Sequence, residues 1–243
     1  MRIDAAEEHI VILHPSDHHG EAFKFLGCMI DPDLRMHSAV EQDLSKIRPK
    51  IRAILRTRGY YSIPNLILQF KTHIWGLIET NMGGYFHAAS YLLENIDKAQ
   101  NRFLRELGIT PEHAFMEHAF APPSLRRNIG ALGFLHKRVL GKCHPSTASL
   151  LPFWTNQPEE IRARGHSKKL YGHFVEIRYQ RAIYDRSIFS MIDIYNNLPQ
   201  HVVDLTSVSA FQQYLTHTAK TRCQAGDPRW VNSFCARSGR IFD

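Results

Sequence analysis

The sequence has 243 residues, enough for one large domain or two small ones, and its 44% hydrophobic and 22% charged residues are ordinary for a globular protein. Thirty Lys and Arg against 23 Asp and Glu give a formal net charge of +7, with an isoelectric point near 9.3. This excess of positive charge favours an anionic partner, nucleic acid more than a membrane surface. The alternative is a basic surface that is simply solvated.

The four cysteines, Cys28, Cys143, Cys223 and Cys235, are too widely spaced for a typical metal motif or disulfide framework. They indicate a reduced, intracellular protein, nuclear or cytoplasmic and not secreted. Acidic residues stand within the first eight positions, where a secretory leader needs an apolar run. No apolar stretch of the sequence approaches the roughly 20 residues needed to cross a bilayer, so we expect no membrane contact.

Two short apolar runs near the N-terminus, residues 9–13 and 22–30, flank a polar segment rich in turn-forming residues. This pattern predicts a β-hairpin within residues 1–36. Asp31 and Asp33 follow the second run and carry the hard oxygen ligands that suit Mg²⁺. Their Asp-Pro-Asp context is more typical of a turn that ends a strand.

Helical patterns dominate from residue 37 and predict a helical bundle over residues 37–142. Ser38 and Glu41 form a capping-box pattern at the start of its first helix. Pro49 lies inside this helix and is expected to kink it. Four further helices are expected to begin near residues 64, 90, 111 and 123. Apolar residues of the first helix recur at three- and four-residue steps and define one buried face: Val40, Leu44, Ile47, Ile51, Ile54 and Leu55.

The same helix and the residues just after it carry six basic side chains with no acid between them: Lys46, Arg48, Lys50, Arg52, Arg56 and Arg58. Arg48, Arg52 and Arg56 are four residues apart, so they are expected to form a ridge beside the buried face. Such a ridge is either a solvated flank or an edge that binds phosphates. Six like charges within a short segment favour the second interpretation.

Residues 143–243 are predicted to form a basic extension with two or more helices, separated from the bundle by an irregular stretch that contains several prolines. In this region Lys168 and Lys169 lie near Tyr171, Phe174 and Tyr179. Basic residues mixed with aromatic rings suit a single strand or a hybrid duplex, because rings stack on bases while cations hold phosphates. The alternative is that the rings belong to the core.

The residues needed for nucleotidyl transfer are missing from the sequence. That reaction uses two metal ions held by carboxylates, which polymerases usually supply as an adjacent acidic pair. The sequence has no Asp-Asp pair. His14, His18 and His19 are close in sequence, but no cysteine or acidic pair completes a metal site. Glycine-rich phosphate loops and the Gly-x-Ser-x-Gly motif are also absent from the sequence, so no cofactor is expected.

Four segments, in order, resemble the C-terminal part of reverse transcriptases encoded by non-LTR (LINE-type) retrotransposons. Residues 23–31 (FKFLGCMID) are similar to the primer grip, the strand that positions the primer end, and residues 96–104 (IDKAQNRFL) are similar to a thumb helix. Residues 125–132 (LRRNIGAL) resemble the element that follows. Residues 195–199 (YNNLP) resemble the family's closing segment, in which Tyr195 replaces the usual tryptophan.

The resemblance implies a mainly α-helical protein: a residual palm-edge hairpin over residues 1–36, a thumb-like bundle over 37–142 and a basic extension over 143–243. It implies binding of RNA or an RNA–DNA hybrid, with three residues near the primer end and five at phosphates. The expected nucleic-acid-binding residues are Phe25, Leu26 and Gly27 in the first group, and Arg48, Arg52, Arg56, Lys168 and Lys169 in the second.

The family's catalytic palm would lie upstream of Met1, so we expect this chain to be inactive alone as an RNA-directed DNA polymerase. The full-length family enzyme is expected to use Mg²⁺. A truncated copy or a partial gene model would explain the missing palm. Three alternatives stay open: a domesticated helical module that binds a protein, one piece of a split enzyme whose palm comes from a longer product, and a remnant without function.

Overall fold

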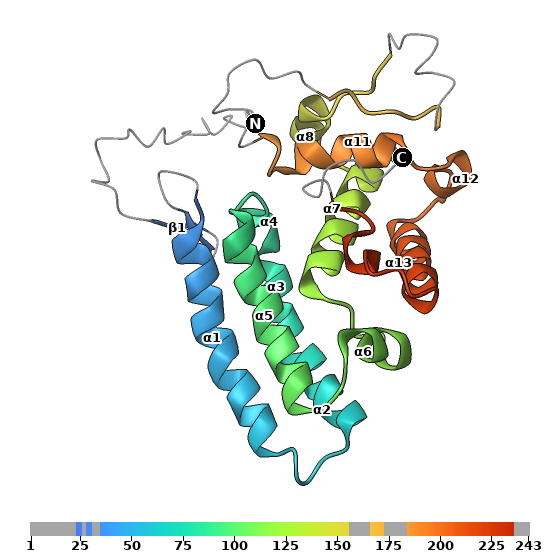
Figure 1. Ribbon diagram of the computed structural model, residues 1–243. Coiled ribbons are helices and arrows are strands. Elements are labelled where there is room, and N and C mark those ends of the chain that lie inside the picture. The colour runs from blue at the N-terminus through green and yellow to red at the C-terminus, as the bar shows by residue number, and fades with distance from the viewer. Residues whose placement is uncertain (1–22, 26–27, 31–34, 156–165, 173–183, 236–243) are drawn as a thin grey trace, which may run out of the picture.

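The computed structural model describes residues 23–25, 28–30, 35–155, 166–172 and 184–235 (Figure 1). This part of the chain is mainly helical, with a small β-hairpin at its N-terminal end, which confirms the predicted fold class. Its helices enclose two hydrophobic cores. The first core lies among the hairpin and the helices up to residue 106, with Ala114 and Phe120 added. The second lies among the helices from residue 123 onward, with Phe115 and Ala121 added.

Strands β1 (Phe23–Phe25) and β2 (Cys28–Ile30) form the hairpin, with Phe25 opposite Cys28 in an antiparallel register. The sequence predicted pairing between two separate apolar runs, but the second run pairs with itself. The first run, residues 9–13, lies outside the described residues. A methyl group added at Gly84 would lie 2.7 Å from the Cys28 Sγ, so this glycine lets the hairpin dock closely on the helical bundle.

Helix α1 (His37–Arg56) buries the apolar face that its sequence predicts, including Val40, Leu44 and Ile47. The predicted capping box is wrong, because the helix begins one residue before Ser38. Met36 occupies the N-cap position in a left-handed conformation (φ 61°), and no side chain caps the helix there.

The first core is completed by a series of helices that follow α1. Helix α2 (Ile63–Phe70) continues through a single π-helical turn, η1 (Lys71–Trp75), into α3 (Gly76–Thr80). The short helix α4 (Met82–Tyr85) then leads to α5 (Ser90–Glu106), which packs along α1. Phe70, Phe103 and Tyr85 are fully buried between these helices.

The second core forms around α7 (Pro123–Val139), which packs against α13 (Val208–Gln224) and α11 (Met191–Asn196). The remaining elements are α6 (Pro111–His118), α8 (Pro145–Leu150), α12 (Gln200–Val203) and the short 3₁₀ turns η2 (Ile188–Ser190) and η3 (Trp230–Asn232). Helix α7 contributes most of its buried side chains to the second core and also packs on α5 of the first. The division of the chain at residue 142 stays a prediction.

Trp75 lies at the seam between the two cores. One face of its ring stacks on Phe120, with the ring centroids 5.2 Å apart. The Arg126 guanidinium covers the ring at 3.6 Å from the centroid, and its Nε donates to the Glu79 carboxylate at 2.6 Å. This stack joins the π-helical turn of the first core to α7 of the second.

Buried polar contacts reinforce the same seam. The Asp97 carboxylate accepts a hydrogen bond from the Ser124 backbone N–H (2.8 Å) and pairs with the buried Arg127 (3.5 Å). Burial raises the pKa of Asp97, while Arg127 and the Ser124 N–H act in the opposite direction. The Lys71 ammonium donates to the His118 carbonyl at 2.5 Å. α5 and η1 are therefore tied to α7 and α6 by defined contacts.

Two histidines hold Tyr195 in the second core. The Leu205 carbonyl can only accept, so the His136 Nε2–H donates to it (2.8 Å) and Nδ1 accepts from the Tyr195 hydroxyl (3.0 Å). The Lys168 backbone N–H donates to the His166 Nδ1 (3.1 Å), so the His166 Nε2–H donates to the Tyr195 carbonyl (3.0 Å). These contacts require a neutral His166, and burial lowers the pKa of His136, which also favours its neutral form.

Among the described residues, no helix combines the length and the apolar character required to cross a membrane.

We predict that Gly133→Ala destabilises the protein, because the added methyl group would approach the Gln212 Cδ and Cγ at 2.9 and 3.0 Å where α7 meets α13. The free energy of unfolding, measured by urea denaturation, should fall by about 1–3 kcal/mol. Gly76→Ala is the matched control: its added methyl meets nothing within 4 Å, and it should raise stability by roughly 0.5–1 kcal/mol. Equal effects at both glycines would contradict the close packing of α7 on α13.

We also predict that stability falls as the pH drops below about 6.5, the ordinary pKa of histidine. Burial lowers the pKa of His136 and of His166 in the folded protein, so the unfolded chain takes up protons first. Each histidine then removes up to about 1.4 kcal/mol of unfolding free energy per pH unit until its folded-state pKa is reached.

The measurement is unfolding free energy by urea denaturation between pH 7.5 and 5. His136→Gln should flatten the decline, and the exposed His217→Gln controls for the substitution itself. A decline that is identical in His136→Gln and the parent chain would show that His136 does not contribute to it.

Candidate nucleic-acid interface

Helix α1 and the turn after it present the six predicted basic side chains to solvent. Lys46, Arg48, Lys50, Arg52, Arg56 and Arg58 are all exposed. Arg48, Arg52 and Arg56 are spaced at about 6 Å along the helix axis, since each residue advances the helix by about 1.5 Å. The predicted ridge is therefore present as a row of cations on the outer surface of α1.

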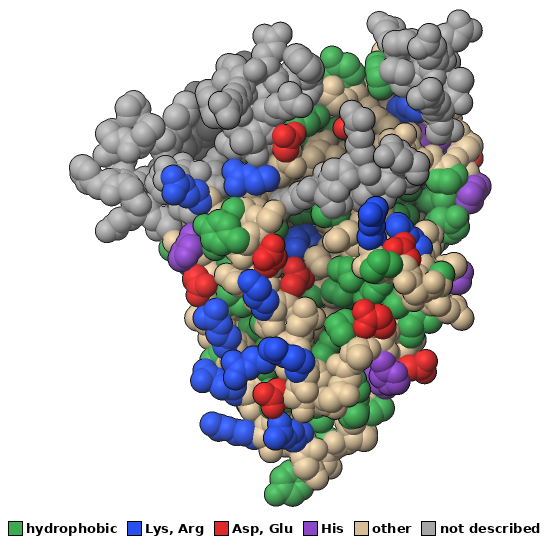
Figure 2. Space-filling view, in the orientation of Figure 1, with side chains coloured by type: hydrophobic (Ala, Val, Ile, Leu, Met, Phe, Trp, Pro, Cys, Tyr) green, Lys and Arg blue, Asp and Glu red, His purple; other side chains and the backbone are tan. Residues whose placement is uncertain are grey.

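Helix α5 extends this surface with two basic residues that the sequence analysis did not select. Arg102 and Arg105 are exposed near the C-terminal end of α5, which lies beside α1. Figure 2 shows Lys and Arg side chains gathered over α1 and the adjoining end of α5. We call these residues the α1–α5 basic face: Lys46, Arg48, Lys50, Arg52, Arg56, Arg58, Arg102 and Arg105. The three-residue spacing of Arg102 and Arg105 was visible in the sequence, but their position beside α1 depends on how the helices pack.

Most of the charge on this face is not neutralised within the described part of the chain. Arg48 pairs with Glu41 (3.5 Å) and Arg58 pairs with Glu106 (2.8 Å), in both cases between exposed side chains. Exposed pairs of this kind contribute little free energy, so a phosphate can replace the carboxylate at small cost. The six other basic residues form no ion pair with a described residue.

One acidic group lies close to the face but is not exposed on it. Asp43 is buried on α1, and its carboxylate accepts a hydrogen bond from the Asn81 amide (2.8 Å). Burial raises the pKa of Asp43, while Asn81 and the nearby Lys46 lower it. Lys46 is therefore partly compensated by this carboxylate. The cations of the face with the least compensation are Lys50, Arg52, Arg56, Arg102 and Arg105.

Lys168 and Lys169 do not join the basic face. Their segment lies beside α11, and Asn196 exchanges hydrogen bonds with the Leu170 backbone there. The Lys168 ammonium pairs with Asp204 (2.9 Å). Only 3% of Lys169 is exposed, so its ammonium is not accessible to a phosphate on the surface. Both lysines thus belong to the second core's side of the molecule, apart from the arginine ridge on α1 (Figure 1).

Of the three predicted primer-end residues, the structure describes Phe25. Phe25 is the last residue of β1, and β2 packs against α1, so the hairpin adjoins the N-terminal end of α1 (Figure 1), about 16 Å along the helix from Arg48. Leu26 and Gly27 lie outside the described residues. The exposed Lys24 is next to Phe25 in β1 and adds a further cation at this end.

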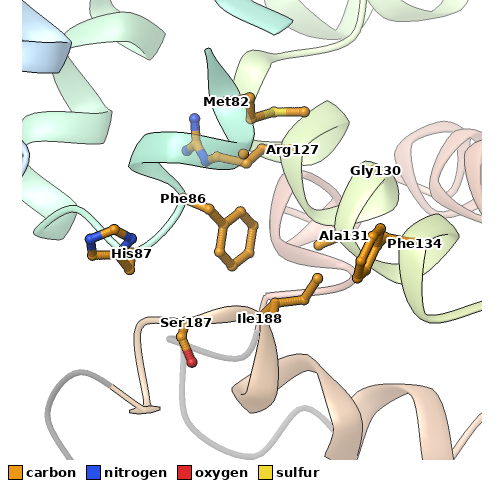
Figure 3. Close-up of a pocket in the computed structure, with 10 residues that line it drawn as sticks. Met82, Phe86, His87, Arg127, Gly130, Ala131, Phe134, Ser187 and Ile188 are labelled. Atoms are coloured by element: carbon orange, nitrogen blue, oxygen red, sulfur yellow. The ribbon is translucent and has the colours of Figure 1, made fainter. Parts of the chain in front are cut away.

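A separate hollow of about 390 Å³ lies between α4, α7 and η2. Phe86, Phe134 and Ile188 point toward one another around it, and the buried Arg127 runs along one side (Figure 3). Its lining is mainly apolar, so it suits an apolar group better than a phosphate. The sequence analysis did not find this hollow, because its walls come from segments about 50 residues apart along the chain or more.

The described residues contain no group of three or more His, Cys, Asp and Glu side chains that could hold a metal ion. The basic face itself carries cations and few acids, an arrangement that attracts polyanions and repels divalent metals. Its chemistry is that of a binding surface.

Comparison with known proteins identifies no relative: no family model, no curated protein and no solved structure matches the chain.

Proposed function

We propose that this chain binds the phosphate backbone of RNA or an RNA–DNA hybrid, as the template- and primer-handling part of a non-LTR reverse transcriptase. The observation that carries the proposal is the row of exposed cations on α1, of which Lys50, Arg52 and Arg56 have no ion-pair partner among the described residues. Binding through phosphates alone does not depend on the base sequence of the nucleic acid.

The geometry of the ridge supports contact with one nucleic-acid strand. Three arginines at about 6 Å intervals can each meet a different phosphate of a strand that follows the helix. Arginine also bonds phosphate through a planar fork of N–H donors, which gives it an advantage over a point charge. Arg102 and Arg105 on α5 are positioned to contact a second strand or the next phosphates along.

The order of elements supports the assignment to the polymerase family. The hairpin that resembles a primer grip is followed directly by the basic helix, as expected for a palm edge that leads into a thumb. The sequence has no Asp-Asp pair to hold two catalytic metal ions. The chain alone is therefore proposed as a binding protein, and polymerase activity would require a palm supplied by another polypeptide or a longer product.

A second candidate function, a protein-interaction module, is favoured by one observation. The apolar hollow beside Phe86 and Phe134 has the size and lining to accept an apolar side chain of a partner. This function would make no use of the α1–α5 basic face. Affinity for nucleic acid therefore separates the two proposals.

We predict that binding to a 20-nucleotide RNA–DNA hybrid weakens with salt at a log–log slope of about −4 to −5, if about six phosphates are contacted. Arg52→Gln combined with Arg56→Gln should make this slope less steep by about 1.5–2, because each phosphate contact contributes roughly 0.7–0.9. Fluorescence anisotropy at several salt concentrations measures both values.

The matched control combines Lys137→Gln with Arg229→Gln. It removes the same two charges from exposed positions outside the α1–α5 basic face. We expect this variant to retain nearly the parent slope. Identical slopes and affinities for the two double variants would overturn the proposal, because net charge rather than this face would then govern binding.

A further inference from the structure

The turn between α1 and α2 ends the α1–α5 basic face with two exposed aromatic rings. Tyr60 is 88% exposed, more than any other large hydrophobic side chain in the described part of the chain, and Tyr61 is 48% exposed. They follow directly after Arg56 and Arg58. An exposed tyrosine alone is ordinary, but here the most exposed ring adjoins a row of cations.

The backbone of this turn is held by hydrogen bonds. The Thr57 N–H donates to the Ile54 carbonyl (3.0 Å), and the Tyr60 N–H donates to the Thr57 carbonyl (2.9 Å). The Thr57 hydroxyl donates to the same Ile54 carbonyl at 2.7 Å. The Arg58–Glu106 pair ties the turn to the end of α5. The outward position of Tyr60 is thus set by the fold, which reduces the entropy lost when the ring binds a ligand.

Folding does not account for Tyr60, since a ring that stays almost fully exposed gains little from burial. Its surroundings favour one kind of ligand. A ring can stack on any nucleic-acid base, while adjacent cations hold the phosphates of the same strand. The bases inside a duplex already stack on their neighbours, so a projecting ring can reach only an unpaired base.

We propose that Tyr60 stacks on an unpaired base of a strand whose phosphates lie on the α1–α5 basic face. The site would therefore select single-stranded nucleic acid, or the overhang that extends beyond a duplex. This inference rests on the proposed function, because the cations of the ridge bring the strand to the ring. Tyr61, which is less exposed, lies next to it and is available to the following base.

The experiment compares a 20-nucleotide single strand, with 2-aminopurine at successive positions, to a blunt duplex of the same length. The parent chain should quench 2-aminopurine fluorescence at one or more positions of the single strand, because stacking quenches this base. Tyr60→Ala should lose that quenching and weaken single-strand binding by roughly 5- to 100-fold. Its affinity for the blunt duplex and its salt slope should stay at parent values, because no phosphate contact is removed.

Three further variants test whether the aromatic ring of Tyr60 is the cause of the quenching and of the tighter single-strand binding. Tyr60→Phe should behave as the parent, since it keeps the ring. Tyr60→Leu should resemble Tyr60→Ala, since it keeps apolar area but no ring. Tyr91→Ala is the matched control: Tyr91 is also highly exposed, at 61%, but it stands in the first turn of α5, away from Arg102 and Arg105. Thermal unfolding of all variants should match the parent, because Tyr60 buries little surface.

The outcomes separate this inference from the proposed function. If Arg52→Gln with Arg56→Gln weakens binding while Tyr60→Ala quenches and binds like the parent, stacking at Tyr60 is excluded and the phosphate surface stands. Parent-like single-strand binding by Tyr60→Leu would also exclude stacking. If the parent chain binds neither the single strand nor the duplex, both proposals fail.

Discussion

The burial of one face of α1 against α5 is the constraint on which the rest of the surface depends. Val40, Leu44 and Ile47 are almost completely buried, and each contributes about 1.5–3 kcal/mol by leaving water. Because helix positions are related by a fixed rotation, placing these residues inward forces Arg52 and Arg56 outward. Repulsion between two exposed cations about 6 Å apart in water is below about 1 kcal/mol, less than the burial of one of these side chains contributes, so it cannot turn the helix over. Apolar packing therefore holds the basic face in place without a bound polyanion.

The seam between the two cores fixes where the other surfaces lie relative to this face. Asp97 and Arg127 are paired in a largely buried position, where removing one partner would leave an uncompensated charge. The π-helical turn that ends at Trp75 adds a stack of three groups at the same seam. π-Helical turns inside α-helices are uncommon and often occur where a side chain must be placed for a specific contact. Here the Trp75 stack holds the two cores together. The apolar hollow is lined by residues other than those of the basic face.

The sequence predicted the features that depend on local periodicity and could not predict those that depend on packing. The apolar face of α1 and the Arg52–Arg56 ridge follow from three- and four-residue spacing, and the structure has both. The described hairpin forms within the second apolar run, a pairing that composition did not predict, because strand pairing is decided by register and by the short connection. The sequence could not predict that Lys169 is buried, because its burial depends on packing against residues that are distant along the chain.

The elements along one side of the molecule form a surface that needs no carboxylate pair to hold a nucleic-acid strand. The hairpin adjoins one end of α1, and the Tyr60 turn forms the other, about 30 Å away along a helix of 20 residues (Figure 1). Holding a strand over that length draws on positive charge and on ring stacking, and neither requires a carboxylate pair. Catalysis requires carboxylates that bind metal, and these would compete with the cations for space and charge on the same surface. On physical grounds, the exposed cations of this face and the Tyr60 ring are therefore suited to the nucleic-acid binding proposed above.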